Sequence, residues 1–159
     1  MSDLRDELFS LLVPLAGERL IVPRACVAEV ISYQVPAAMT NAPPWYLGVI
    51  SWNGRSLPIV SFEGAFGQVL PSVSSRTRIV IFHSSGGQVA SGYFGMLTQG
   101  FPQLVRVTAD VIRPDPTRSF PERSPVICQV HMVNETPLIP DMERLEQMIA
   151  EETSVIPQG

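Results

Sequence analysis

The chain has 159 residues, of which 45% are hydrophobic and only 16% charged, and its net charge is −4. This composition supplies a core for one domain or two very small ones and argues against disorder. The basic residues are scattered arginines without any run, so the sequence offers no electrostatic basis for nucleic-acid binding. No apolar run reaches the ~18 residues of a membrane span. Only two cysteines occur, Cys26 and Cys128, and we expect reduced core thiols in a cytoplasmic protein without direct membrane insertion.

Short strands with frequent turns are predicted from the N-terminus onward. A first pair of strands is expected over 9–15 and 19–22, with a turn at 16–18. Residues 24–31 carry Val27, Val30 and Ile31 at a helix-like spacing. The segment 33–40 is expected to be a loop or a short extended piece.

The strongest local signal is the hairpin within residues 42–67. Asn53-Gly54 favours a two-residue I′ turn, because that turn needs a positive φ at both central positions. Pro58 lies in the returning strand, where it predicts an edge or a bulge. The aromatic residues at the hairpin either fill a core or, where exposed, anchor a partner; they are Trp45, Tyr46 and Trp52.

The second half of the chain reads as further strands followed by one helix. The predicted elements are a Ser-rich loop at 69–77, strands at 78–83 and 88–97, a proline-rich connection at 108–125, and strands at 126–133 and 136–139. Asp141 is a good N-cap. The apolar residues that follow share one helical face, and they are Met142, Leu145, Met148 and Ile149.

Motifs of catalysis and cofactor binding are not found in the sequence. His83 and His131 each lie in a strand pattern, with no nucleophile beside them. Cys128 and His131 would point to opposite faces of a strand, and the sequence holds no second pair of zinc ligands. No phosphate-binding loop or dinucleotide fingerprint occurs. We therefore expect no catalytic residue, no metal and no cofactor.

Several segments, in order, resemble the CheW family of chemotaxis scaffold proteins. The hairpin resembles the family signature P-x-x-x-x-G-V-I-N-L-R-G-x-x-V-P-V-x-D-L-R-x-x-x-G, and the first strands resemble its opening. The segments that carry the likeness are Ile21-Val22-Pro23, Val27, Glu29-Val30, Pro44, Gly48-Val49-Ile50, Gly54, Pro58-Ile59-Val60, Thr77-Arg78-Ile79-Val80, Gly95-Met96-Leu97, Ile112-Arg113-Pro114 and Leu138-Ile139-Pro140-Asp141.

The resemblance implies a mainly β fold with two SH3-like five-stranded β-barrel subdomains and a C-terminal helix. The CheW-like domain is expected over 8–142, with its subdomains divided near 71–78. The closing amphipathic helix is expected over 141–152, between flexible tails at 1–7 and 153–159. The independent reading of the chain as two halves, with similar strand content on either side of the Ser-rich loop, agrees with this fold.

The resemblance also implies a non-catalytic adaptor that couples chemoreceptors to a CheA-type histidine kinase. The expected partners are the kinase regulatory domain, the cytoplasmic tip of a methyl-accepting chemoreceptor and other CheW-like proteins, at the inner face of the membrane. The implied receptor groove consists of Val27, Glu29, Leu47, Asn53, Phe101 and Leu104. The hairpin residues singled out beside it are Trp52, Gly54, Arg55 and Pro58.

Departures from the family pattern concentrate at charged positions. Asn53 stands where the family has arginine, and Arg55 follows the glycine instead. The family's charged Asp-Leu-Arg is Ser61-Phe62-Glu63 here. We interpret the chain as a divergent accessory member and expect a pilus-linked chemosensory system.

Two other classes of function stay open at this stage. One is a small β-barrel module that binds an unrelated protein or ligand, which predicts a single exposed aromatic stripe and no division into two barrels. The other is an enzyme on a β scaffold, which predicts a polar pocket with a histidine beside an acid.

Overall fold

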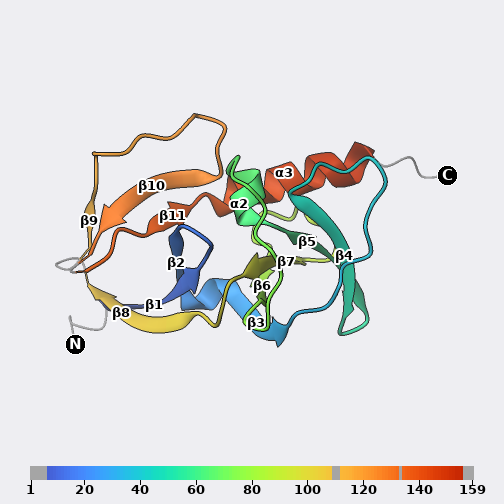
Figure 1. Ribbon diagram of the computed structural model, residues 1–159, viewed down its shortest axis with the longest axis horizontal. Helices are drawn as coiled ribbons and strands as arrows, with labels where there is room; N and C mark the ends of the chain where they lie inside the picture. Colours follow the sequence, from blue (N-terminus) through green and yellow to red (C-terminus); the bar gives the residue numbers. More distant parts are fainter. Residues whose placement is uncertain (1–6, 109–111, 133, 156–159) are drawn as a thin grey trace.

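The computed structural model describes residues 7–108, 112–132 and 134–155, and these residues form two β-sheet lobes side by side along the long axis (Figure 1). The six-stranded lobe has the strand order β8-β1-β2-β11-β10-β9, and the five-stranded lobe has the order β3-β6-β7-β5-β4. The strands of the six-stranded lobe are β1 (Glu7–Pro14), β2 (Arg19–Pro23), β8 (Gln103–Thr108), β9 (Arg113–Pro114), β10 (Val126–His131) and β11 (Leu138–Pro140). Those of the five-stranded lobe are β3 (Val27–Ser32), β4 (Tyr46–Trp52), β5 (Arg55–Val60), β6 (Arg78–His83) and β7 (Tyr93–Thr98). The mainly β architecture with two sheets is thereby confirmed.

Between β1 and β11 the chain changes lobes twice. It leaves the six-stranded lobe through the short 3₁₀ helix η1 (Arg24–Cys26), builds the whole five-stranded lobe, and returns between β7 and β8. Residues 71–78 therefore do not divide the subdomains, because they join α2 (Phe62–Ala65) to β6 within the five-stranded lobe. The predicted split was wrong because it assumed that each lobe is one continuous half of the chain.

The helix-like spacing at residues 24–31 comes from a β-bulge. Only η1 is helical, and the rest of the segment is β3. The pairing of β3 with β6 shifts register between Val27 and Glu29. The extra residue places Val27 and Val30, three apart, against the same core cluster. A bulged strand thus reproduces the i, i+3 pattern of a helix.

The Asn-Gly hairpin forms as predicted. Asn53 has a φ of 48° and Gly54 a φ of 75° between β4 and β5. Pro58 pairs with Val49 on β4, while the parallel pairing of β5 with β7 begins only at Ile59. β5 is an interior strand of the sheet, and its proline lies where the ladder on the other side has not yet begun.

Several boundaries differ from the sequence prediction. β7 begins at Tyr93 rather than 88, and the strands β8 and β9 were not predicted. Glu7 opens β1, and α3 (Met142–Val155) continues beyond 152. The remaining parts of the predicted tails, 1–6 and 156–159, lie outside the described residues, as does residue 133 of the predicted strand 126–133.

Three buried clusters organise the interior. One lies inside the five-stranded lobe and includes Leu57, Ile59 and Ile81. A smaller one lies inside the six-stranded lobe and includes Leu12 and Ile21. The largest cluster joins the lobes, because it contains residues of β1, β2, β5, β6, β7 and α3; they include Val13, Leu20, Val60, Phe82, Met96, Leu145 and Ile149. Strands such as β6 therefore bury both faces, which explains their continuous apolar sequence.

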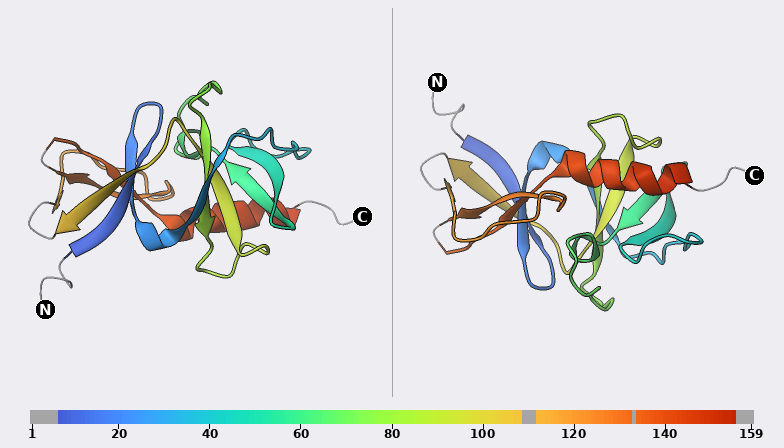
Figure 2. Two further views of the ribbon diagram at one scale, coloured as in Figure 1. Left: turned by 90° about the horizontal axis from the view of Figure 1, so that it is seen from below. Right: turned by 90° about the horizontal axis from the view of Figure 1, so that it is seen from above.

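The closing helix α3 connects the two lobes. It follows β11 of the six-stranded lobe and runs along the five-stranded lobe (Figure 2). Asp141 caps its start, since its carboxylate accepts a hydrogen bond from the Arg144 amide at 3.0 Å. Glu146, only 1% exposed, accepts hydrogen bonds from Ser84 Oγ at 2.6 Å and from the Gly86 amide at 3.1 Å. The predicted amphipathic helix is thus present and docked by both apolar and polar contacts.

Candidate partner-binding surfaces

The sequence-predicted groove residues lie on several different elements. Val27 and Glu29 are on β3, Leu47 is on β4, Asn53 is at the hairpin tip, and Phe101 and Leu104 lie at or near the start of β8. Val27 is partly buried against the shared core, whereas Glu29 and Asn53 are exposed. These residues therefore belong to three different surfaces.

The first surface surrounds the hairpin. Trp52 Nε1 donates a hydrogen bond to the Glu29 carboxylate at 3.0 Å, which links β4 to β3. The Trp52 ring meets Tyr93 edge-on at a centroid distance of 5.0 Å. Arg55 lies over the same Tyr93 ring at 5.3 Å and donates to the Ser91 carbonyl. Arg55 is therefore held beside the hairpin tip by an aromatic face and a backbone oxygen.

The second surface joins β6 to the outer face of the six-stranded lobe. Phe101 is 64% exposed, and the guanidinium of Arg78 lies 4.8 Å from the centre of its ring. Leu104 is 52% exposed and pairs with Leu11 across the β1–β8 ladder. Two large apolar side chains are thus presented to solvent, one of them next to a cation, and such a combination is typical of a protein contact.

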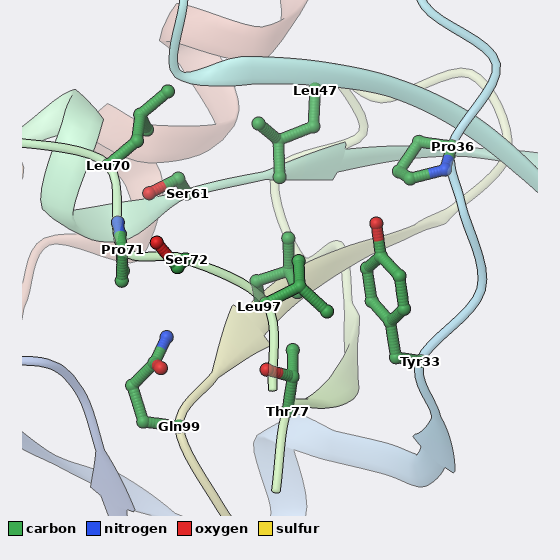
Figure 3. A pocket seen from close by; sticks show the side chains of 11 residues that line it. Tyr33, Pro36, Leu47, Ser61, Leu70, Pro71, Ser72, Thr77, Leu97 and Gln99 are labelled. Carbon is green, nitrogen blue, oxygen red and sulfur yellow. The ribbon is translucent and has the colours of Figure 1, made fainter. Parts of the chain in front are cut away.

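The third surface is a pocket at the mouth of the five-stranded lobe, with a volume of about 230 Å³. Leu47 and Leu97 form its apolar floor, and the segment 70–73 forms one wall. Figure 3 shows Tyr33 and Pro36 on the opposite side, with Leu97 between the two walls. None of the residues that line this pocket carries a charge. We call it the barrel-mouth pocket.

Aromatic residues at the hairpin serve mainly as packing. Tyr46 is buried in the shared core, and Trp45 packs partly against it. Trp52 is partly buried against the core of the five-stranded lobe. The packing interpretation is therefore favoured over that of exposed anchors, and large exposed apolar side chains are found at Phe101 and Leu104 instead.

Among the described residues, no group of three or more His, Cys, Asp or Glu side chains is placed to hold a metal ion. Cys26 and Cys128 are free, and burial together with the charge of Glu146 raises the pKa of the Cys26 thiol. His83 and His131 lie exposed at the ends of β6 and β10. In the part of the chain that the structure describes, no helix has the length and apolar character needed to cross a membrane.

Sequence reasoning missed most of the barrel-mouth pocket. It singled out Leu47 but not Tyr33, Leu70 or Leu97. Together with Leu47 these residues come from four separate segments that only the barrel brings together. It also missed the pairing of Arg78 with Phe101. One signal was available: residues 69–73 contain three apolar side chains in a loop predicted to be exposed.

Comparisons with known proteins agree on one family. The model of the CheW-like domain matches residues 10–149. A probable chemotaxis protein CheW of Rhizobium etli is 28% identical over 90 residues, and a chemotaxis protein CheW of Rhizobium meliloti is 30% identical over 90 residues. Each of these alignments covers 57% of this chain and 55% of the relative, so the chain spans about half the length of the curated relatives it matches.

One solved structure supports the fold. The scaffolding protein TtCheW of Thermoanaerobacter tengcongensis superposes with a TM-score of 0.71 at 18% identity. The match covers 84% of this chain and 88% of that one. The pairing of two SH3-like barrels with a closing helix is therefore shared.

Proposed function

The chain belongs to the CheW-like domain family, and from this membership we propose that it is a non-catalytic adaptor that couples chemoreceptors to a CheA-type histidine kinase. The observation that carries the proposal is the extent of the family match, which spans both lobes and most of α3. The proposed partners are the kinase regulatory domain, a chemoreceptor cytoplasmic tip and other CheW-like proteins. The protein would act in the cytoplasm beneath the receptors, and a pilus-linked system remains our proposal for its setting.

Two separate lobes suit an adaptor, because different partners can occupy different faces at the same time. The alternative of a single-barrel binding module predicted no division into two sheets, whereas the described chain has two. The enzyme alternative predicted a polar pocket with a histidine beside an acid, and no histidine lines the barrel-mouth pocket. The adaptor is accordingly the function that we propose.

For the receptor groove we propose the surface that runs along β3 to Phe101 and Leu104. The exposure of these two side chains supports their use as anchors. Arg78 beside Phe101 would add a charged contact at the edge of the groove. Glu29, Leu47 and Asn53 would complete the surface towards the hairpin.

Phe101→Ala tests the groove directly. We expect the affinity for a chemoreceptor tip from the same genome to fall by more than about 1 kcal/mol, because a large exposed anchor is lost. Isothermal titration calorimetry measures this, and the thermal transition should stay unchanged. Ile127→Ala is the control, since Ile127 is equally exposed, at 61%, but lies on β10. Equal affinities of the two variants would remove Phe101 from the interface.

Asn53→Arg restores the arginine of the family signature. Receptor binding by the natural chain should depend weakly on salt, because one charged contact is missing. The variant should bind more tightly at low salt and lose this gain as the salt concentration rises. If affinity and salt dependence are both unchanged, position 53 does not face the receptor, and the proposed groove must be moved away from the hairpin.

A further inference from the structure

The barrel-mouth pocket is surrounded by exposed apolar side chains. Eight large apolar residues are exposed in the described part of the chain, and four of them line the pocket or adjoin a lining residue in sequence; these are Val35, Val69, Leu70 and Val73. An apolar cavity with an apolar rim is costly to leave in water, and such patches mark binding sites. We therefore expect a binding partner that covers the apolar surface of the pocket and its rim.

The size of the pocket points to a side chain as the occupant. Its volume of about 230 Å³ lies below the roughly 300–1,000 Å³ typical of small-molecule and cofactor sites. Interfaces often seat one aromatic or branched aliphatic anchor in a pocket of this kind. Ser61, Thr77 and Gln99 offer neutral polar groups at the walls, so a charged ligand would find no partner inside.

The charged residues in the part of the chain that forms the pocket are mainly basic. Between residues 30 and 109 the sequence has four arginines and a single acid, Glu63, in a chain whose net charge is −4. Glu63 is buried, and its carboxylate accepts a hydrogen bond from the Ala16 amide at 2.9 Å. Near the pocket, Arg76 and Arg78 flank the lining residue Thr77, and Arg78 bonds to the carbonyls of Ser75 and Thr77.

The acidic groups of the molecule are placed elsewhere. The helix α3, which carries several acids, lies on one side of the five-stranded lobe, and residues 66–77 lie on the other (Figure 2). Glu18 is tied to the same loop, since it accepts a hydrogen bond from Gln68, but it is paired with Arg118 at 2.8 Å. The charged residues that adjoin the pocket lining in sequence are therefore arginines, and they suit an occupant with carboxylates.

We propose that the barrel-mouth pocket is a docking socket for an acidic segment of a partner protein, which inserts one large apolar side chain between Leu97 and the wall 70–73. Arg76 and Arg78 receive the flanking carboxylates. The socket adjoins the proposed receptor groove, because Leu47 and Arg78 belong to both. The proposal itself depends on the pocket and the charge distribution alone.

Synthetic peptides provide the probe. The first has one central phenylalanine between two pairs of glutamates, the second replaces the glutamates with lysines, and the third replaces the phenylalanine with alanine. We expect the first peptide to bind at least fivefold more tightly than the others and to shift the NMR signals of Leu47, Leu97 and Gln99. Equal binding of the three peptides, or shifts confined to other residues, would overturn the proposal.

Variants of the full chain complete the test. Val73→Asp places a carboxylate on the rim, where the native side chain is 51% exposed, and should weaken binding of the first peptide at least fivefold. Ser72→Phe fills the pocket from its own wall and should do the same, which guards against a folding defect in one variant. Ile127→Asp is the matched control and should bind like the natural chain. If Val73→Asp and Ile127→Asp bind alike, the socket does not exist.

A second copy of this chain is the competing occupant. Sedimentation velocity of the natural chain over a range of concentrations separates the two cases. A monomer at all concentrations agrees with the proposal. A dimer that Val73→Asp dissociates would assign the pocket to self-association and overturn it.

Discussion

The two lobes share a strand architecture but are stabilised by different kinds of contact. Strands of the five-stranded lobe are apolar on both faces, one against its own core and one against the shared core. The core of the six-stranded lobe is smaller, with four buried apolar residues. Its long connection between β9 and β10 is held instead by polar contacts, which centre on Arg118 and Asp115.

Arg118 shows how the polar contacts join the lobes. Its guanidinium binds both carboxylate oxygens of Glu18, at 3.1 and 2.8 Å, and lies over the rings of Phe66 and Phe120. Hydrogen bonding to Glu18 raises the pKa of Arg118. Phe66 follows α2 in the five-stranded lobe, so this one side chain links the two lobes beside their shared apolar core. We infer from this contrast that apolar contacts stabilise the two lobes, whereas polar contacts fix the position of the connection between β9 and β10.

The pockets repeat this contrast. The barrel-mouth pocket of the five-stranded lobe has no charged lining residue, whereas a pocket at the turn of β1 and β2 is lined by Glu18, Arg19 and Glu135. Arg19 and Glu135 form an ion pair there. The two pockets therefore differ in chemistry, with a neutral lining on the five-stranded lobe and a charged lining on the six-stranded lobe.

Leu145→Ala should lower the stability of the protein more than any other substitution considered for the two lobes. Leu145 is fully buried in the shared core, and its truncation should lower the free energy of unfolding by roughly 2–4 kcal/mol. Because this core joins both lobes, chemical denaturation followed by fluorescence and by circular dichroism should show one common transition. Leu104→Ala, at an exposed leucine, should change stability by less than about 0.5 kcal/mol. Two separate transitions in the Leu145 variant would show that the lobes unfold independently.

Glu146→Gln should have the next largest effect. One oxygen of Glu146 accepts from both Ser84 Oγ and the Gly86 amide, and the other faces the Ser85 amide. A glutamine keeps the first oxygen but sets an NH₂ group against the Ser85 N–H, so about 1–3 kcal/mol of stability should be lost. Urea denaturation measures the loss. Glu143→Gln is the control, because Glu143 is exposed on the same helix. A loss of equal size in the control would attribute the effect to helix charge rather than to the buried contacts.

How much of this molecule the sequence could predict depended on whether a signal is local. The Asn53-Gly54 turn and the Asp141 cap are decided by adjacent residues, and both form as predicted. The bulge in β3 depends on pairing with β6, some fifty residues away, and its spacing imitated a helix. The division into lobes was misplaced for the same reason, because β1 and β2 find their partners at the other end of the chain.

The candidate surfaces also differ in whether the sequence could predict them. Family resemblance pointed to Phe101 and Leu104, and the structure places both in solvent. The barrel-mouth pocket could not be predicted, because its lining comes from β4, β7 and the connecting segments that follow β3, β5, α2 and β7. A loop rich in Ser and apolar residues gives no sign in the sequence of what it will face.

Protonation of Asp115 should have the smallest effect on stability. It tests whether polar contacts hold the connection between β9 and β10. Its carboxylate accepts hydrogen bonds from the Thr117 hydroxyl at 2.6 Å, from the Thr117 amide at 3.0 Å and from Gln129 Nε2 at 3.0 Å. These bonds, those of Thr117 above all, lower the pKa of Asp115 in the folded chain. A carboxyl with a lowered folded pKa adds stability above its unfolded pKa of about 3.9, and this contribution is lost as the pH falls through the folded value.

Acidification below about pH 4 should therefore loosen the connection between β9 and β10 before it affects the apolar five-stranded lobe. NMR signals of Thr117 and Gln129 should move with the titration of Asp115, while those of Ile59 and Ile81 stay fixed. Asp115→Asn should abolish the movement, because the amide does not titrate in this range. If the signals of the two lobes change together at the same pH in both proteins, the polar contacts do not act separately from the shared core, and the contrast between the lobes fails.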